Sequence, residues 1–433
     1  MLFEIKSFED RISNLYPKVM DLSLGRIENL LKKLGNPQDQ IERIIHIAGT
    51  NGKGSTLTYI SSILTSSGYS VDSYTSPHLV SFNERIKIGS DGHQYDIDDT
   101  SLAEILLECE RVNDGDPITI FELITAAAFL KFSTTNSDFL ILETGLGGRL
   151  DATNVIKRPL VSVITPIGID HQQFLGDSIQ EIAREKAGII KHNCKTVLSY
   201  QDRGIMPVFE DSIISKNNES KIWNENFIVT DHGEWFSYSD DKYQMSLPLP
   251  NLYGRHQIVN AGTAIAAISS ISDICPTLES FESGIKNADW PARLDLLETG
   301  PLHEHVQHGT EIWVDGGHNS HAAIVIAEAM KALDDKELIL IMGMLNTKDS
   351  LKFLEPFKEI TEMIIAVNIP DNSNSHTPMR IVDDAKTLGI SATKEIDLHN
   401  ALERAQESSK NPKRILICGS LYLAGYVMKI HRG

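Results

Sequence analysis

The segment from Gly49 to Ser55 combines residue types that bind phosphate. It carries three glycines, Lys53 and two hydroxyl side chains in seven positions, after an apolar run at residues 44–47 and before a stretch with helical spacing. Glycines allow the backbone to turn its N–H groups toward an anion, and the start of a helix adds partial positive charge. With Lys53 over the anion and Ser55 placed to hold Mg²⁺, this strand–loop–helix pattern predicts a triphosphate site.

The loop departs from the common phosphate-binding pattern, in which lysine directly precedes serine or threonine. Here Lys53 lies between Gly52 and Gly54, so that Ser55 is one position further along. The alternative is an ordinary glycine-rich turn. The strand before the loop and the helix after it favour the phosphate site.

Polar residues follow three other strand-like runs, where they could hold a metal ion. They are Ser76 in YTSPHL, Glu143 in FLILETGLGG, and Asp170 with His171 in SVITPIGIDHQQ. Ligands of open parallel sheets bind beyond the carboxyl ends of the strands, so we expect these side chains near the glycine loop. Mg²⁺ prefers hard oxygen ligands, which makes Glu143 the natural carboxylate. A helix-capping glutamate and a structural histidine are the alternatives.

Further polar residues could contact a nucleotide. Asp315 and His318 in WVDGGHNS follow a strand-like run, where they could face the nucleotide or form an Asp-capped turn. Asn260, in the first turn of an expected helix, could read an adenine edge, and Arg293 could reach a phosphate. Lys186 lies on another expected helix and by itself is typical of a solvent-exposed charge. The sequence has no G-x-S-x-G or G-x-G-x-x-G pattern, which disfavours a hydrolase triad and a dehydrogenase.

Alternating apolar runs and helical segments must position these residues. The runs cover residues 43–49, 69–76, 137–145, 160–168 and 195–200, and a second series covers residues 311–317, 337–345, 363–370 and 414–422. This alternation predicts an α/β protein with mainly parallel sheets covered by helices. We expect a domain boundary near residue 297, which gives domains at 1–297 and 298–433. The aromatic-rich stretch at 220–250 alternates in polarity and predicts an antiparallel excursion from the first domain.

Length and composition limit the possible classes of protein. The chain has 433 residues and a net charge of −19. The length favours two domains, and the distributed negative charge argues against a nucleic-acid partner. The sequence contains no run of about 18 apolar residues, so we expect no membrane partner and a cytoplasmic monomer. The four cysteines are far apart and suggest reduced core thiols rather than a zinc site or disulfides.

Taken together, the motifs resemble the folylpolyglutamate synthase and dihydrofolate synthase family of the Mur ligase superfamily. The resemblance rests on AGTNGKGST, YTSPHLVSFNERI, TIFELITAAAF, ETGLGGRLDATN, DHQQFLG, EIAREKAGIIK, WPARLD, DGGHNSHAA and CGSLYLAG. It implies an N-terminal P-loop ATPase domain and a smaller Rossmann-like C-terminal domain. The chain departs from the family pattern at Ser320, where proline is usual, and at Thr347, where aspartate is more frequent.

The resemblance also implies roles for individual residues. The ATP-binding positions are Gly52, Lys53, Gly54, Ser55, Asn260, Arg293 and Asp315. Two Mg²⁺ ions are implied, with ligands Ser55, Ser76, Glu143 and His171, and Lys186 matches a lysine that is carbamylated in the family. The folate-type substrate is expected at Asp21, Leu22, Ser23, Thr119, Ile120, Phe121, Glu122, Leu150, Asp151 and Ala152.

The implied reaction is the ATP-dependent formation of an amide with L-glutamate. A substrate carboxylate attacks the γ-phosphate, and glutamate then displaces phosphate from the acyl phosphate, with Lys53, Lys186 and His318 expected to be catalytic. DLSLGRI resembles the dihydropteroate-site segment of bifunctional members, so we expect both dihydropteroate and reduced folates as acceptors. The alternatives are a folylpolyglutamate synthase alone or a nucleotide-dependent switch. A peptidoglycan-type Mur ligase is disfavoured, because only 48 residues precede Gly49.

Overall fold

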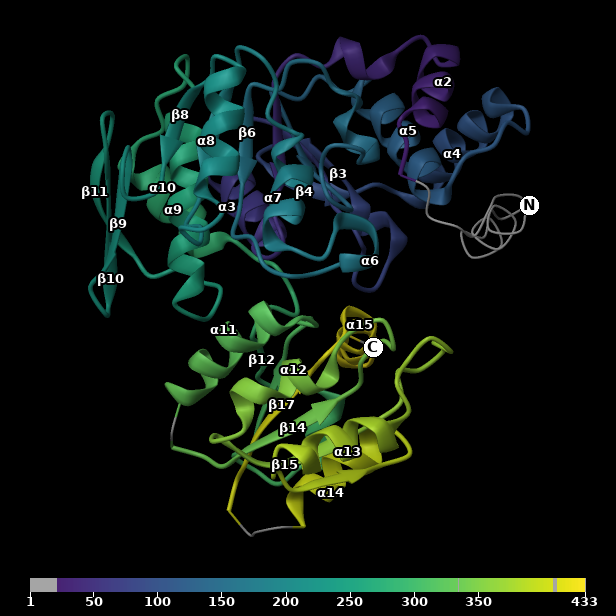
Figure 1. Cartoon of the computed structure of the whole chain (residues 1–433), viewed down its shortest axis with the longest axis vertical. Coiled ribbons are helices and arrows are strands. Elements are labelled where there is room, and N and C mark those ends of the chain that lie inside the picture. The colour runs from purple at the N-terminus through teal and green to yellow at the C-terminus, as the bar shows by residue number, and fades with distance from the viewer. Residues whose placement is uncertain (1–21, 334, 408–410, 433) are drawn as a thin grey trace. The chain divides into compact units, whose positions relative to one another are not determined.

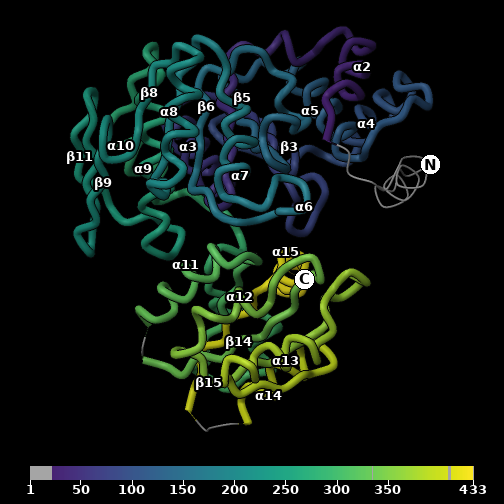
Figure 2. Tube along the Cα trace, in the orientation of Figure 1, coloured from purple at the N-terminus to yellow at the C-terminus, as the bar shows by residue number. Residues whose placement is uncertain are grey.

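The computed structural model describes residues 22–333, 335–407 and 411–432. The described chain divides into two compact units (Figures 1 and 2). Unit 1 runs up to Asn251 and includes Ile258–Ala288, and unit 2 combines Leu252–Gln257 with the residues from Asp289 on. The expected boundary near residue 297 falls inside unit 2, at the end of the strand Asp295–Leu297. The chain enters this unit earlier, at Asp289.

Unit 1 is built on an eight-stranded sheet with strand order β4-β3-β2-β5-β1-β6-β7-β8. Its strands are β1 (Ile44–Ala48), β2 (Val71–Tyr74), β3 (Ile86–Ser90), β4 (His93–Asp96), β5 (Phe139–Glu143), β6 (Val161–Ile164), β7 (Lys195–Leu198) and β8 (Glu219–Ile222). Among the described residues, the antiparallel pairs of this sheet are β2 with β3 and β3 with β4. Every residue of β1, β5 and β6 is buried, as expected for parallel strands covered on both faces.

Helices cover this sheet and fix where its loops begin. They are α2 (Gly25–Lys33), α3 (Lys53–Ser66), α4 (Asp99–Asn113), α5 (Ile120–Phe132), α6 (Gln172–Leu175), α7 (Ile179–Ala187), α8 (Met206–Ser215), α9 (His256–Ser269) and α10 (Leu278–Asn287). Ile44 of β1 packs in one hydrophobic core with α2, α4 and α5, whereas Ala48 packs with α7 and α8. The single strand β1 therefore contributes to two hydrophobic cores, one from its first residue and one from its last.

The stretch near residues 220–250 forms a separate three-stranded sheet. Its strands β9 (Phe227–Asp231), β10 (Trp235–Asp240) and β11 (Gln244–Pro248) pair antiparallel, the arrangement that the alternating sequence predicts. The sheet packs on α9, since a Cβ atom on Gly262 would lie 2.4 Å from Val229.

Unit 2 contains a six-stranded sheet with strand order β12-β13-β17-β14-β15-β16, in which only β12 is antiparallel among the described residues. Its strands are β12 (Asp295–Leu297), β13 (Glu311–Val314), β14 (Leu338–Met342), β15 (Thr361–Ala366), β16 (Ala392–Lys394) and β17 (Arg414–Cys418). Its helices are α11 (Ser320–Lys331), α12 (Ser350–Leu354), α13 (Pro378–Thr387), α14 (Leu398–Gln406) and α15 (Leu421–Arg432). The prediction of two α/β units with mainly parallel sheets is confirmed.

Short 3-10 helices connect several of these elements. They are η1 (Pro37–Gln40), η2 (Phe82–Arg85), η3 (Ala152–Val155), η4 (Pro301–His305) and η5 (Glu355–Phe357). Of the cysteines, Cys109, Cys194 and Cys418 are buried free thiols, but Cys275 is exposed, so the expectation of four core thiols is wrong at that position. No helix in the described parts of the chain is both long and apolar enough to cross a membrane.

Candidate active site

The glycine loop, residues 49–55, leaves the carboxyl end of β1 and enters α3. Its backbone is held by the carbonyl oxygen of Pro166, which accepts from the N–H groups of Thr50 at 3.1 Å and Asn51 at 3.3 Å. Gly52 caps α3 with a φ of 82°, and it has no side chain that could cap the first turn. The first turn contains no acidic residue, so its N–H groups suit an anion.

Three residues from different elements gather beside this loop. Lys53 Nζ lies 3.2 Å from the carbonyl oxygen of Gly49 and 3.9 Å from Glu143 Oε1. The other carboxylate oxygen of Glu143 accepts from the backbone N–H of Ser76 at 3.4 Å. The hydroxyl oxygen of Ser76 is buried and has no hydrogen-bond partner among the described residues. A carboxylate and an unpartnered hydroxyl beside an anion-binding loop are suitable oxygen ligands for Mg²⁺.

Lys186 reaches the same loop from α7. Its Nζ lies 2.7 Å from the carbonyl oxygen of Gly49, and the residue is only 5% exposed. The alternative of a solvent-exposed charge is therefore wrong, because α7 packs against the loop. Burial, helped by the charge of Lys53, lowers the pKa of Lys186 to about 7, while Asp170 and Asp151 act in the opposite direction.

His171 lies at the start of α6, next to Asp170. Its backbone φ is 51°, its side chain is 41% exposed, and its Nε2 lies 3.9 Å from Asp170 Oδ2. Within the described ranges, no three His, Cys, Asp or Glu side chains converge on a common metal position. A metal ion here would depend on hydroxyl and phosphate oxygens as well as on Glu143, which is a ligand set typical of magnesium–nucleotide sites.

The expected acceptor residues at the start of α5 are ordered by a capping box. The Thr119 hydroxyl accepts from the N–H of Glu122, and the Glu122 carboxylate accepts from the N–H of Thr119 at 2.7 Å. Glu122 is also paired with Arg26 of α2 at 3.0 Å, so its carboxylate has structural partners. Between them, the half-buried Phe121 lies so close to Gly145 that an added Cβ would be 2.4 Å from the ring.

A second acceptor segment precedes η3. Asp151 is buried, and its carboxylate accepts from the backbone N–H groups of Leu146 at 2.8 Å and Thr153 at 2.9 Å. Leu150 is half-buried and Ala152 is buried. Leu22 and Ser23 lie shortly before α2, whose Arg26 contacts the start of α5. Ile120 is the first residue of α5, and Asp21 lies outside the described residues.

The nucleotide residues fall in two groups. In unit 1, Asn260 Oδ1 would lie 2.4 Å from a Cβ on Gly52, so this amide packs against the glycine loop. Asn260 is the fifth residue of α9 and not in its first turn as predicted, because the helix already begins at His256.

In unit 2, Asp315 directly follows β13 and accepts from the N–H groups of Leu294 at 2.8 Å and Gly317 at 2.6 Å. Burial raises the pKa of Asp315, although the charge of Arg293 opposes this shift. The Arg293 guanidinium would lie 2.7 Å from a Cβ on Gly316, whose carbonyl oxygen accepts from His318 Nδ1 at 3.0 Å. Unit 2 thus brings Arg293, Asp315 and His318 to one end of β13.

Comparison with known proteins agrees with this arrangement. The model for the Mur ligase middle domain matches residues 47–268, and the model for the Mur ligase, glutamate ligase domain matches residues 302–421. The dihydrofolate synthase/folylpolyglutamate synthase of Bacillus subtilis is 32% identical over 94% of each chain. The chain belongs to this family of Mur ligases. The expected family and the expected enzyme class, a ligase, are both confirmed.

Other members carry one activity or both in their names. The dihydrofolate synthetase of Saccharomyces cerevisiae is 33% identical over 95% of this chain and 98% of its own length, and the folylpolyglutamate synthase of Lacticaseibacillus casei is 33% identical over 93% and 92%. The Escherichia coli FolC structure in complex with DHPP and ADP is 28% identical, with a TM-score of 0.88 over 99% of this chain and 97% of that one.

Sequence reasoning missed two residues of this Mur ligase site, His46 and Thr153, and singled out a third, Asp170, without giving it a role. Asp170 acts electrostatically on Lys186, and His46 and Thr153 form a buried hydrogen bond next to Asp151. For His46 a signal was present, because a histidine interrupts the otherwise apolar run at 44–48. For Thr153 the sequence carried no comparable signal, since His46 lies 107 residues away along the chain.

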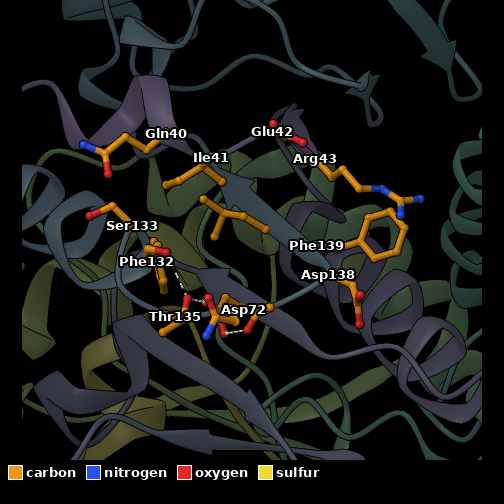
Figure 3. Close-up of a pocket in the computed structure, with 13 residues that line it drawn as sticks. Gln40, Ile41, Glu42, Arg43, Asp72, Phe132, Ser133, Thr135, Asp138 and Phe139 are labelled. Atoms are coloured by element: carbon orange, nitrogen blue, oxygen red, sulfur yellow. Dashed lines mark hydrogen bonds between the residues drawn. The ribbon is translucent and has the colours of Figure 1, made fainter.

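A separate hollow of about 330 Å³ lies near the amino ends of β1 and β5 in this Mur ligase (Figure 3). It is lined by residues 40–43 ahead of β1, by residues 132, 133 and 135–140 from the end of α5 to the start of β5, and by Asp72 of β2. The Asp72 carboxylate accepts from the Ser137 hydroxyl at 2.6 Å and from the N–H of Gly89 at 2.8 Å. The glycine loop leaves the other end of β1, so this hollow is not part of the candidate active site.

Proposed function

We propose that the protein is an ATP-dependent ligase that adds L-glutamate to dihydropteroate and to reduced folates. The observation that carries the proposal is the convergence of Lys53, Lys186, Glu143 and Ser76 on the glycine loop in unit 1. Relatives of comparable identity named for one or both activities support this reaction class. Dihydropteroate is supported by the E. coli structure with DHPP, and ATP by that structure and a Mycobacterium tuberculosis folylpolyglutamate synthase with ADP.

The first step needs a carboxylate to approach a triphosphate, which brings like charges together. Lys53 and the N–H groups at the start of α3 stabilise the phosphate oxygens, and Ser55, Ser76, Glu143 and His171 are the proposed Mg²⁺ ligands. When bound, Mg²⁺ supplies charge neutralisation on the phosphates. The acceptor carboxylate oxygen forms a bond to the γ-phosphorus as the bond to ADP breaks.

The second step joins glutamate to the activated acceptor. The glutamate amine attacks the acyl carbon, inorganic phosphate leaves and the amine loses a proton. Arg293, Asp315 and Asn260 are proposed to hold the nucleotide, and His318 to orient the transferred phosphoryl group. The folate-type acceptor is proposed to bind at the start of α5 and at the start of η3, together with Leu22 and Ser23. These are the residues expected from the sequence.

Lys186 is proposed to act as a carbamate. Its lowered pKa leaves much of the amine neutral near pH 7, and a neutral amine attacks CO₂ with release of one proton. The product is an anion beside the glycine loop, where it would add an oxygen ligand for magnesium. A monomeric state and residence in the cytoplasm stay predictions.

The decisive experiment measures ATP-dependent phosphate release with L-glutamate and either dihydropteroate or tetrahydrofolate, together with product masses. A gain of one glutamyl unit on both acceptors supports the proposal, and a gain on tetrahydrofolate alone reduces it to polyglutamylation. Phosphate release that ignores glutamate and both acceptors would instead indicate a nucleotide-dependent switch. Lys53→Met should abolish the response, whereas Lys157→Met, at an exposed lysine paired with Asp39, is the matched control.

A further inference from the structure

A histidine lies inside the strand that carries the glycine loop. His46 is fully buried in β1, where its backbone pairs with Leu142 of β5 and Ser162 of β6. Its Nε2 lies 2.8 Å from the hydroxyl oxygen of Thr153 in η3. This hydrogen bond joins two segments that are 107 residues apart in the sequence. None of the roles proposed above uses His46.

The direction of this hydrogen bond follows from the number of protons available. The Thr153 hydroxyl has one hydrogen, which it donates to Asp151 Oδ1 at 2.5 Å. The Thr153 oxygen must therefore accept from His46, so His46 carries its proton on Nε2. In agreement, His46 Nδ1 has no hydrogen-bond partner among the described residues. Burial, with a contribution from Lys191, lowers the pKa of His46 to about 3, so the ring is neutral at physiological pH.

The chain of hydrogen bonds ends in the proposed acceptor segment. Asp151 receives the Thr153 hydroxyl and the N–H groups of Thr153 and Leu146, and it forms the N-cap of η3. The side chain of His46 thus links β1, through Thr153, to the turn that carries Leu150, Asp151 and Ala152. Three residues after His46, the same strand passes into the glycine loop at Gly49.

We propose that His46 is a positioning residue that sets the acceptor segment against the ATP-binding loop through Thr153 and Asp151. The inference rests on the proposed function, because it takes residues 150–152 as part of the site for a folate-type acceptor. Acyl phosphate formation requires the acceptor carboxylate and the γ-phosphate at a fixed separation. A shared anchor on β1 provides that separation, and its loss weakens acceptor binding without weakening ATP binding.

The test compares variants that keep or remove each hydrogen-bonding group. Thr153→Val preserves the shape of the side chain but removes the hydroxyl, whereas Thr153→Ser keeps the hydroxyl. Likewise, His46→Leu removes the Nε2 donor, and His46→Gln places an amide N–H near its position. We expect KM for dihydropteroate to rise about tenfold in Thr153→Val and His46→Leu, with KM for ATP changed by less than about twofold. Thr153→Ser and His46→Gln should stay within about threefold of the wild type for both substrates.

Coupling is measured with the double variant. Because both groups act through one chain, His46→Leu combined with Thr153→Val should raise KM for dihydropteroate no further than either change alone. Three results would overturn the proposal. The first is a fall in melting temperature with equal effects on both KM values, and the second is an unchanged KM for dihydropteroate. The third is a raised KM for dihydropteroate in the conservative variants Thr153→Ser and His46→Gln. If His46→Leu does not fold, the Thr153 pair decides alone. If the wild-type protein adds no glutamate to dihydropteroate, the proposed function itself fails, and this result is distinct from those above.

Discussion

The Nζ atom of Lys186 lies 2.7 Å from the carbonyl oxygen of Gly49, so the end of α7 contacts the first residue of the glycine loop. Lys53 reaches the same carbonyl oxygen at 3.2 Å. Two lysines thus approach one acceptor atom, and the buried one of the two has its pKa lowered to about 7. A buried lysine with a lowered pKa next to a phosphate loop is suited to reaction rather than to charge pairing.

The first prediction is that activity depends on dissolved CO₂. Since only the neutral amine forms a carbamate, roughly nine-tenths of Lys186 is reactive at pH 8 and roughly one-tenth at pH 6 when the pKa is near 7. We expect phosphate release at pH 8 to fall in decarbonated buffer and to recover on addition of bicarbonate. Lys186→Arg should lose activity and the bicarbonate response, whereas Lys157→Arg should retain both. Wild-type activity that is indifferent to bicarbonate at both pH values would count against the carbamate.

The second prediction separates a contact at Gly52 from backbone strain. Gly52 has a φ of 82° and Gly68 a φ of 87°, but an added Cβ meets Asn260 Oδ1 at 2.4 Å only at Gly52, with nothing within 4 Å at Gly68. Both alanine variants should lose about 1 kcal/mol of stability from the left-handed backbone. Only Gly52→Ala should also raise KM for ATP, by about tenfold or more, because Asn260 or the loop must move. Equal KM values for ATP in the two variants would show that Asn260 does not constrain the loop.

The sequence predicted those features that depend on neighbours along the chain. The apolar runs predicted nine of the parallel-sheet strands, and T-x-x-E at residues 119–122 is a readable capping box. The run at 44–48 marks His46 as a polar residue in a buried strand, but its contact with Thr153, like the burial of Lys186, depends on which distant elements pack together. Asp151 could not be interpreted from its neighbours either. Its hydrogen-bond partners lie within the same loop, but its burial depends on the packing of the whole unit.

The third prediction concerns the ring of Phe121. A Cβ on Gly145 would lie 2.4 Å from Cζ of that ring, so Gly145→Ala must displace Phe121 or the loop. If Phe121 contacts the pterin of the acceptor, KM for dihydropteroate should rise about tenfold while KM for ATP changes little. Gly68→Ala is the control, because nothing lies within 4 Å of its added Cβ and Gly68 lies outside the proposed acceptor segments. Initial rates at varied concentrations of each substrate distinguish this result from a general loss of activity.

The fourth prediction concerns the pH dependence of stability in unit 2. Glu311, at the start of β13, accepts from Arg414 at 2.7 Å, from Lys336 at 2.5 Å and from the Trp313 indole at 3.0 Å. Burial raises the pKa of Glu311, but these hydrogen bonds outweigh it and lower the pKa to about 2, from an ordinary value of 4.5. A depressed carboxylate pKa stabilises the fold above the unfolded-state pKa, and this stabilisation is lost as pH falls from about 4.5 toward 2.

Glu311→Gln should therefore lower the urea midpoint at pH 7, with a loss of about 2 kcal/mol, and should flatten the decline in that midpoint between about pH 4.5 and 2. Glu108→Gln is the control, because Glu108 pairs with Arg111 on the exposed surface of α4, where ion pairs contribute little. Far-UV circular dichroism during urea titration at several pH values gives both quantities. Parallel pH profiles for the wild type and Glu311→Gln would mean that the Glu311 pairing does not govern the acid stability of this unit.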